Sequence, residues 1–98
     1  MKYILETDAA VENDIDEASM YYETRNEGLG DRLVAEIYQM IDLLLENPHL
    51  FQKRHGEYRI ATTQKFNYKL IYRIYENKVS LISVQHPSQH PTLWSKRL

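Results

Sequence analysis

Lys69 and Arg73 stand four residues apart in a segment, 66–75, whose alternate positions differ sharply in polarity. One set of positions is wholly apolar or aromatic and comprises Phe66, Tyr68, Leu70, Tyr72 and Ile74. Because successive side chains of a strand point to opposite faces, that set should face a core, and both cations should project from the open face. Arg59 joins them there if its two sequence neighbours point inward on the preceding strand. Such a basic surface can bind a polyanion or stabilise charge on a reacting phosphate.

His86 is the candidate for acid–base chemistry, since an imidazole titrates near neutral pH. It ends the segment 79–86, which is rich in β-branched residues and should form a central strand. Its position in the alternation places it on the same face as Ile82 and Val84. We therefore favour a histidine that hydrogen-bonds the backbone at the end of a strand over a catalytic histidine.

Two amphipathic helices precede these strands. Asp8 can serve as the N-cap of the first helix, which should run to about Asn26, and Gly28 supplies a left-handed stop. The second helix should begin after Leu29-Gly30 and end at Asn47-Pro48. The helical spacing is carried in the first helix by Val11, Ile15, Ala18 and Tyr22, and in the second by Leu33, Ile37, Met40, Ile41, Leu44 and Leu45. A connector this short forces a helical hairpin.

All these elements form one small α+β domain that spans residues 1–98. Residues 2–6 alternate weakly and predict a short N-terminal strand, and Glu76-Asn77-Lys78 predicts a hairpin turn into the last long strand. Strands joined in sequence order by short turns pair antiparallel. We therefore expect an N-terminal strand and an antiparallel two-helix hairpin that packs on one face of a small, mainly antiparallel β-sheet.

The net charge of −2 conceals a strong asymmetry between the two halves of the chain. Residues 1–50 contain three basic and twelve acidic side chains, a balance of −9, whereas residues 51–98 contain nine basic and two acidic ones, a balance of +7. This split predicts an acidic surface and a basic surface, the latter open to a polyanion or an acidic protein partner. The alternative is a solvated charge dipole that has no partner.

The composition argues against several kinds of site. The chain has no cysteine, which excludes disulfides, cysteine zinc sites and thiol nucleophiles. His86 and His90 are not spaced like zinc ligands, and no glycine-rich phosphate loop is present, so we expect no metal and no cofactor. Glu6 and Asp8 interrupt the apolar run that a signal peptide needs, and no segment is long enough to cross a membrane. A cytoplasmic protein is therefore expected.

The acidic side chains of the first helix have a simple interpretation. Glu12, Asp14, Asp16 and Glu17 decorate the helix faces away from the apolar stripe and should be solvated. Near the other end of the chain, Trp94 should pack the C-terminal tail onto the domain. The four carboxylates of the first helix are therefore not expected to form a catalytic acid–base pair.

The order of the motifs along the chain resembles the RelE/ParE superfamily of bacterial toxins. That family has a Tyr/Arg strand, a Phe-Pro-Tyr strand ending in Tyr-x-Ile, a strand ending in His, then Arg-Asp-Pro, a Trp and a basic end. The corresponding residues are Tyr58-Arg59-Ile60, Phe66-Asn67-Tyr68, Tyr72-Arg73-Ile74, His86, Pro91, Trp94 and Arg97, and upstream Tyr21-Tyr22, Gly28-Leu29-Gly30-Asp31-Arg32 and Glu46-Asn47-Pro48. The chain departs from the pattern at Asn67, in place of proline, and at Gln89-His90, in place of Arg-Asp. The resemblance implies the same α+β fold and the toxin of a type II toxin–antitoxin (plasmid stabilization) system.

One branch of the superfamily, the RelE branch, cleaves messenger RNA in the ribosomal A site. By position, Arg59 corresponds to a lysine of that branch and Lys69 to a catalytic arginine. The catalytic set that the resemblance implies for such a ribonuclease is Arg59, Lys69, Arg73 and His86. However, Ala61 and Gln89 stand where the branch has a second lysine and another arginine. Their exchange removes strong electrostatic stabilisation of a reacting phosphate.

The ParE branch binds DNA gyrase without enzymatic chemistry, and we favour this activity for the chain. The alternatives are a ribosome-dependent endoribonuclease and a non-toxic remnant of the toxin fold. All three predict a cognate antitoxin whose acidic or amphipathic segment lies over the basic sheet face or the helical hairpin; self-association into a homodimer stays open. Contacts with antitoxin or target are expected from Arg59, Lys69, Arg73, Trp94, Lys96 and Arg97.

Overall fold

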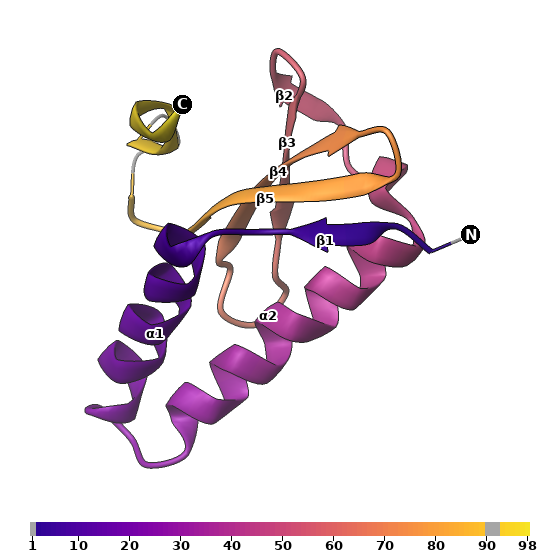
Figure 1. The fold of residues 1–98 in the computed structure, drawn as a ribbon. Coiled ribbons are helices and arrows are strands. Elements are labelled where there is room, and N and C mark those ends of the chain that lie inside the picture. The colour runs from indigo at the N-terminus through magenta and orange to yellow at the C-terminus, as the bar shows by residue number, and fades with distance from the viewer. Residues whose placement is uncertain (1, 90–92) are drawn as a thin grey trace.

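The computed structural model describes residues 2–89 and 93–98, and Figure 1 shows the course of the chain. His90, which the sequence places in a loop, lies outside the described residues. The helices are α1 (Ala9–Glu23), α2 (Leu29–Glu46) and two short 3-10 helices, η1 (Pro48–Leu50) and η2 (Leu93–Arg97). The strands are β1 (Ile4–Glu6), β2 (Lys53–His55), β3 (Tyr58–Thr62), β4 (Lys69–Tyr75) and β5 (Lys78–Gln85).

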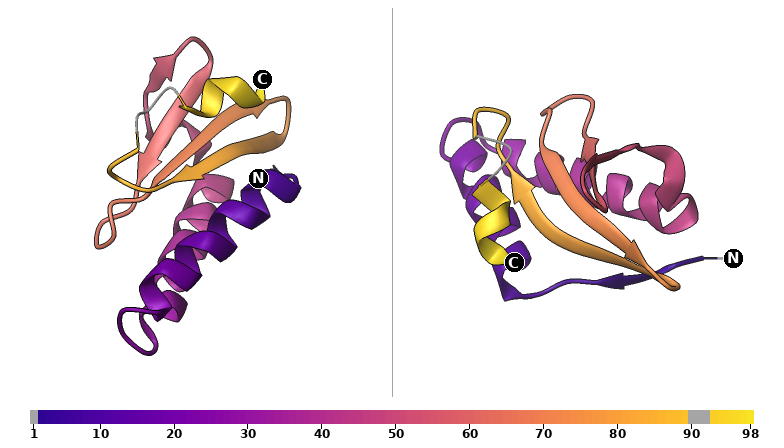
Figure 2. Two further views of the ribbon diagram at one scale, coloured as in Figure 1. Left: turned by 90° about the vertical axis from the view of Figure 1, so that its left-hand side faces the viewer. Right: turned by 90° about the horizontal axis from the view of Figure 1, so that it is seen from above.

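Within the described residues, five strands form one sheet in the order β1-β5-β4-β3-β2. β1 runs parallel to β5, and the other neighbouring pairs are antiparallel. Both long helices cover one face, and η2 lies on the other side of the sheet (Figure 2, left). This confirms the expected α+β architecture of an N-terminal strand, a helical hairpin and a mainly antiparallel sheet. The short edge strand β2 was not expected from the sequence.

The helical hairpin is closed by a glycine contact and a carboxylate. Gly28 has a φ of +83°, and the Glu23 carboxylate accepts hydrogen bonds from the backbone N–H groups of Gly28 (2.9 Å) and Gly30 (3.0 Å). A Cβ atom on Gly30 would lie 2.5 Å from the backbone oxygen of Ser19, so only glycine allows the helices to approach this closely. α1 ends at Glu23, three residues earlier than expected.

The core lies between the helices and one face of β4 and β5. Leu70 and Tyr72 of β4 are fully buried against the helical stripes, as the alternation predicted, and Phe66 and Ile74 are partly buried. The Tyr72 hydroxyl donates a 2.7 Å hydrogen bond to the carbonyl oxygen of Pro48, and burial raises its pKa to about 12. β4 itself begins only at Lys69, because Asn67 adopts a left-handed conformation with a φ of +59° that interrupts an extended strand.

Asp14 on α1 occupies the outer edge of β5. β1 pairs only with the first part of β5, from Lys78 to Ser80, and leaves the rest of that edge uncovered. Beyond β1, the Asp14 carboxylate accepts a 3.0 Å hydrogen bond from the backbone N–H of Val84. An unpaired strand edge is a template for association with other chains, so this contact protects the sheet.

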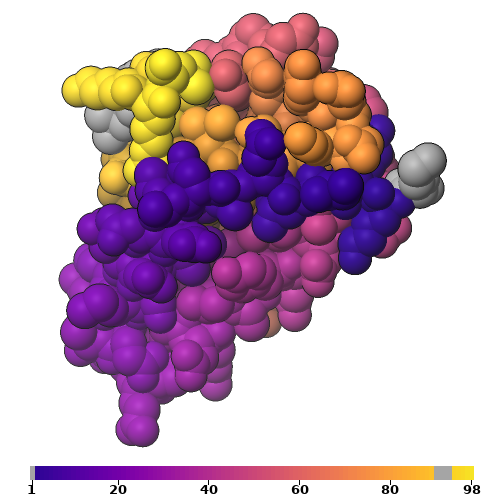
Figure 3. Space-filling model, in the orientation of Figure 1, coloured from indigo at the N-terminus to yellow at the C-terminus, as the bar shows by residue number. Residues whose placement is uncertain are grey.

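The C-terminal tail is held by the same carboxylate. The two terminal guanidinium nitrogens of Arg97 each lie 2.7 Å from one oxygen of Asp14, and Arg97 also donates to the carbonyl oxygen of Ile82 at 3.1 Å. The space-filling view shows the tail in contact with β5 and the start of α1 (Figure 3). The expectation that Asp14 is solvated is therefore wrong: its side chain is only 12% exposed, because donors from β5 and the tail converge on it.

These contacts predict that Asp14→Ala destabilises the fold by about 2 kcal/mol, because the N–H of Val84 and the Arg97 guanidinium lose their acceptor. Urea unfolding measures the loss. Asp16→Ala, which removes an exposed carboxylate from the same helix, serves as the control and should unfold like the parent. Arg97→Ala combined with Asp14→Ala should cost less than the sum of the two single changes. Equal unfolding of the Asp14 and Asp16 variants would contradict this account.

Candidate functional site

Lys69 and Arg73 project from the open face of β4, as the sequence predicted. In the ladder, Lys69 is opposite Thr62 and Gln85, whereas Arg73 is opposite Tyr58 and Ser80. Both cations are half-buried and lie about 13 Å apart along the strand. The Arg73 guanidinium also lies 5.3 Å from the centroid of the Tyr75 ring. The positive charges of Lys69 and Arg73 on the open face are therefore separate.

Arg59 does not join them, so the expectation of three cations on the open face is wrong. In the register of β3 with β4, Arg59 is opposite Tyr72 and therefore shares the face that packs on the helices. There its guanidinium donates a 2.5 Å hydrogen bond to the carbonyl oxygen of Phe51. Tyr58 and Ile60 point to the open face instead of the core. Arg59 thus connects β3 to the segment that follows η1.

The C-terminal tail covers much of the open face, which the sequence indicated only through Trp94. This indole is 4% exposed, and its ring centroid lies 4.8 Å from that of Tyr58 and 5.7 Å from that of His55. Ser83 and Gln85 face away from the helices and are nevertheless buried, and they line a small cavity of about 70 Å³ together with Trp94. The tail therefore forms a second, smaller packed layer.

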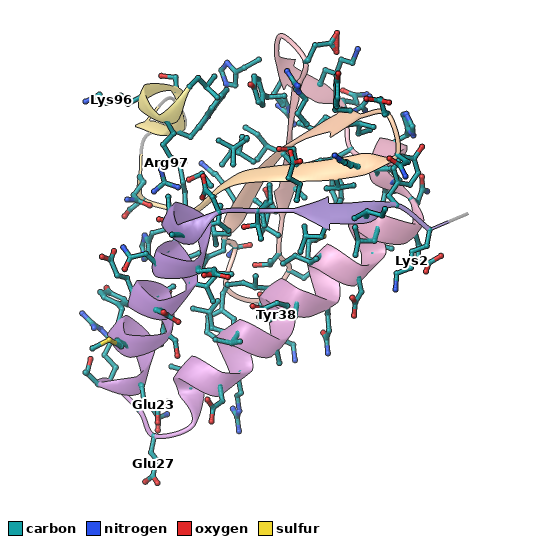
Figure 4. The ribbon with its side chains drawn as sticks, in the orientation of Figure 1. Lys2, Glu23, Glu27, Tyr38, Lys96 and Arg97 are labelled. Atoms are coloured by element: carbon teal, nitrogen blue, oxygen red, sulfur yellow. The ribbon has the colours of Figure 1, made fainter. Side chains whose placement is uncertain are left out.

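Two further basic residues of the tail have different surroundings. Arg97 is paired with Asp14, and this hydrogen bond raises the pKa of the guanidinium. Lys96 is exposed, and Figure 4 shows it pointing away from the molecule. Of these two expected contact residues, Arg97 stabilises the fold and Lys96 is available to a partner.

His86 lies on the helix side of the sheet. Its Nδ1 atom accepts a 3.0 Å hydrogen bond from the backbone N–H of Ser88 and lies 2.7 Å from the hydroxyl of Ser88. The ring stands edge-on to Tyr21 and Tyr68, with centroids 5.6 and 5.5 Å apart. This confirms the interpretation that we favoured, a strand-end histidine that hydrogen-bonds the backbone. An acceptor at Nδ1 places the proton of the neutral ring on Nε2.

The surroundings of His86 are aromatic and acidic. It lines a hollow of about 290 Å³ with Tyr21, Tyr68 and the carboxylates of Asp14 and Glu17. Burial among the neighbouring tyrosines raises the pKa of the Tyr68 hydroxyl. Lys69 and Arg73 are not among the residues that line the hollow, because the sheet separates them from it. The structure therefore does not bring the four residues of the expected catalytic set together.

The role of Asp14 was not predicted from the sequence, although the position of Asp14 in the helix gives one indication of it. Asp14 follows Val11 by three residues and precedes Ala18 by four, which places it at the border of the buried stripe of α1 rather than on the solvated face.

Among residues 2–89 and 93–98, no group of three or more histidine and acidic side chains could hold a metal ion. In the same described part of the chain, no helix is both long and apolar enough to cross a membrane.

Solved structures of toxin–antitoxin proteins share this fold. A chain of the chromosomal ParDE system of P. aeruginosa is 12% identical, with a TM-score of 0.76 over 87% of this chain and 96% of that one. A mutant of the E. coli toxin RelE in the free state is 19% identical, with a TM-score of 0.68 over 90% of this chain and 86% of that one. A chain of the RelBE2 toxin–antitoxin complex of Mycobacterium tuberculosis is 18% identical, with a TM-score of 0.64 over 91% of this chain and 95% of that one.

The sequence itself matches one family model over most of its length. No curated protein sequence matches the chain. The model of the ParE toxin of the type II toxin–antitoxin system parDE, in contrast, matches residues 5–91. This match includes both long helices, the strands β2 to β5 and all of β1 except Ile4. The chain therefore belongs to the ParE toxin family of type II toxin–antitoxin systems.

Proposed function

We propose that this protein is a ParE-like toxin that acts by binding a cellular target, DNA gyrase, and that a cognate antitoxin neutralises it. One observation carries the choice of binding over cleavage: the sheet separates the cations Lys69 and Arg73 from His86. A phosphoryl-transfer site needs its proton acceptor within hydrogen-bond reach of the group whose charge the cations stabilise. This separation supports a protein that acts through its surface.

The surroundings of Ala61 and Arg59, two positions that correspond to lysines of the RelE branch, support the same proposal. Ala61 is fully buried on the helix side of β3, opposite Leu70, so a lysine at this position would enter the core. Arg59 is bound to a backbone carbonyl on that side. Of the expected contact residues, Lys69, Arg73 and Lys96 have charges that are open to a partner. Protein surfaces are typically recognised through a few anchor residues within a larger contact, which suits a binder of gyrase.

The alternative is a ribosome-dependent endoribonuclease. The specific observation in its favour is that Lys69 and Arg73 share the open face, where the phosphate backbone of a messenger RNA could contact both. Both targets are found in the cytoplasm, where we place the protein.

The basic open face also suits the acidic segment of an antitoxin, since such segments order on binding and use charge to steer association.

Growth arrest after induction of the chain distinguishes the two activities. If the chain is a ribonuclease, Lys69→Ala should lower its cleavage rate about a hundredfold and relieve growth arrest, because each lost contact with the reacting phosphate typically lowers the rate by about that factor. For a gyrase binder, we expect Lys69→Ala to weaken arrest only modestly and Lys96→Glu to weaken it more. Arrested cells should become filamentous and retain messenger RNA. Rapid loss of messenger RNA that depends on Lys69 would put the endoribonuclease first.

The antitoxin contact is tested by the rate of association with the cognate antitoxin, which is to be sought as the product of a short reading frame beside this gene. Changing Lys69 and Arg73 together to glutamate should slow association and remove much of its dependence on salt, because electrostatic steering acts mainly on the association rate. Changing Lys2 and Arg25 together to glutamate, at exposed positions before β1 and just after α1, makes the same charge change away from the open face and should leave association like that of the parent. Identical salt dependence in all three proteins would show that the open face is not the contact.

A further inference from the structure

The hollow beside His86 combines aromatic rings with carboxylates. It lies where α1 passes the C-terminal end of β5 (Figure 1), and we call it the His86 hollow. Its volume of about 290 Å³ is close to the lower limit for sites that bind small molecules. Three aromatic rings and two carboxylates line it, those of Tyr21, Tyr68, His86, Asp14 and Glu17. The proposed contacts on the open face leave this hollow unused, because it lies on the helix side of the sheet.

The electrostatic potential at the His86 hollow is negative. α1 carries five acidic side chains and no basic one, and the carbonyl groups at its C-terminal end add partial negative charge. Arg97 compensates the charge of Asp14 through two hydrogen bonds. Glu17, in contrast, is not a member of the ion pairs found among the described residues, and its carboxylate accepts a 3.1 Å hydrogen bond from the Asn13 amide. The uncompensated charge of Glu17 favours a cation over an anion.

The lining favours an organic cation over a metal ion. Asp14, Glu17 and His86 do not form a metal-binding group, since the described part of the chain has no such group of three. An aromatic ring attracts a cation to its face, and the Arg25 guanidinium already lies 3.6 Å from the centroid of the Tyr21 ring. Ala18 and Val84 add apolar surface to the hollow. A ligand that has both a charged group and an alkyl chain matches this lining.

The wall of the hollow that follows β5 is ordered by its own hydrogen bonds. The side-chain oxygen of Gln89 accepts a 2.8 Å hydrogen bond from the backbone N–H of His86, and the backbone N–H of Gln89 donates to the carbonyl oxygen of His86 at 3.0 Å. The backbone N–H of Ser88 donates to the His86 ring, also at 3.0 Å. A site that is already ordered costs less conformational entropy to bind than a mobile one.

We propose that the His86 hollow binds a small organic cation, an alkylguanidinium or a primary alkylammonium. The charged group contacts the Glu17 carboxylate and the Tyr21 ring, and the alkyl chain lies against Ala18 and Val84. This site goes beyond the proposed toxin activity and does not depend on it. The same chemistry is available from a free amine or guanidine and from a lysine or arginine side chain of another protein, two sources that the test distinguishes.

Titration of the purified protein with n-butylguanidinium, followed by NMR spectroscopy, tests the site. We expect saturable shifts of the backbone amides in residues 17–21 and 84–89. The neutral analogue n-butylurea has the same shape and should bind about tenfold more weakly, because it lacks the charge that the carboxylate and the rings attract. Absence of a saturable shift with n-butylguanidinium, or equal binding of n-butylurea, would overturn the proposal.

A second ligand distinguishes the two sources of the cation. The probe is a Gly-Arg-Gly peptide whose ends are blocked, so that its only charge is the guanidinium. Binding of the peptide as strong as that of n-butylguanidinium would support the site and identify a protein side chain as a ligand. Binding of n-butylguanidinium alone would support the site and identify a small molecule, since the hollow then excludes a peptide backbone.

Substitutions at exposed positions connect the binding to the lining residues. Glu17→Gln should weaken binding about fivefold and Tyr21→Leu about threefold, which are the usual effects of an exposed charge pair and of a cation–π contact. Glu12→Gln removes the same charge from α1 outside the hollow and should bind within about twofold of the parent. Thermal unfolding checks that each variant is folded. Equal affinity of the parent and Glu17→Gln would overturn the proposed contact.

Arg25 provides a substitution that should strengthen binding. Arg25→Gln removes a competing cation from the Tyr21 ring and should tighten binding of n-butylguanidinium about twofold. Lys2→Gln removes the same charge beside β1, where Figure 4 labels it, and should leave the affinity unchanged. Equal tightening in both variants would show that net charge alone attracts the ligand, and it would overturn the assignment to the His86 hollow.

Discussion

The Asp14 carboxylate joins three parts of the molecule that the chain brings together from distant positions. It attaches α1 to the outer edge of β5, beyond the point where β1 ends, and it binds the Arg97 guanidinium of the tail. With Arg97 fixed there, Trp94 lies over the open face against Tyr58. The sheet thus acquires a packed layer on each side. The extent of the basic surface depends on this contact, because the tail covers Ser83 and Gln85 on the same face as the half-buried Lys69 and Arg73.

The sheet separates the two cations of the open face from the histidine on the helix side. Lys69 and Arg73 point to the face that carries the tail, whereas His86 points to the helices, where its partners are aromatic rings and a serine. General-base cleavage of a messenger RNA needs the proton acceptor within hydrogen-bond reach of the attacking hydroxyl, at the same site where cations stabilise the developing phosphate charge. A partition of this kind suits recognition of protein surfaces, where charges steer association and a few anchors hold it.

Long amphipathic elements were predictable because each has a single buried stripe. Which side chains of β3 face the core was not predictable. Tyr58 and Ile60 are as apolar as a core position requires, whereas the residue that enters the core is the small Ala61. Over so short a strand, the alternation does not distinguish the two faces. The start of β4 was misplaced because nothing in the composition of Phe66-Asn67-Tyr68 reveals the left-handed backbone of Asn67. Asp14 was misassigned because its donors come from residues 83, 84 and 97, far away in the sequence.

Binding to gyrase without cleavage of messenger RNA is the central claim, and one measurement on the purified protein tests it most directly. The chain is added to a DNA gyrase supercoiling assay and, in parallel, to ribosomes that carry a defined messenger RNA. We expect supercoiling to be inhibited in proportion to the protein added, while the messenger RNA stays intact. Cleavage of the messenger RNA in the ribosomal A site, with supercoiling unaffected, would contradict the account.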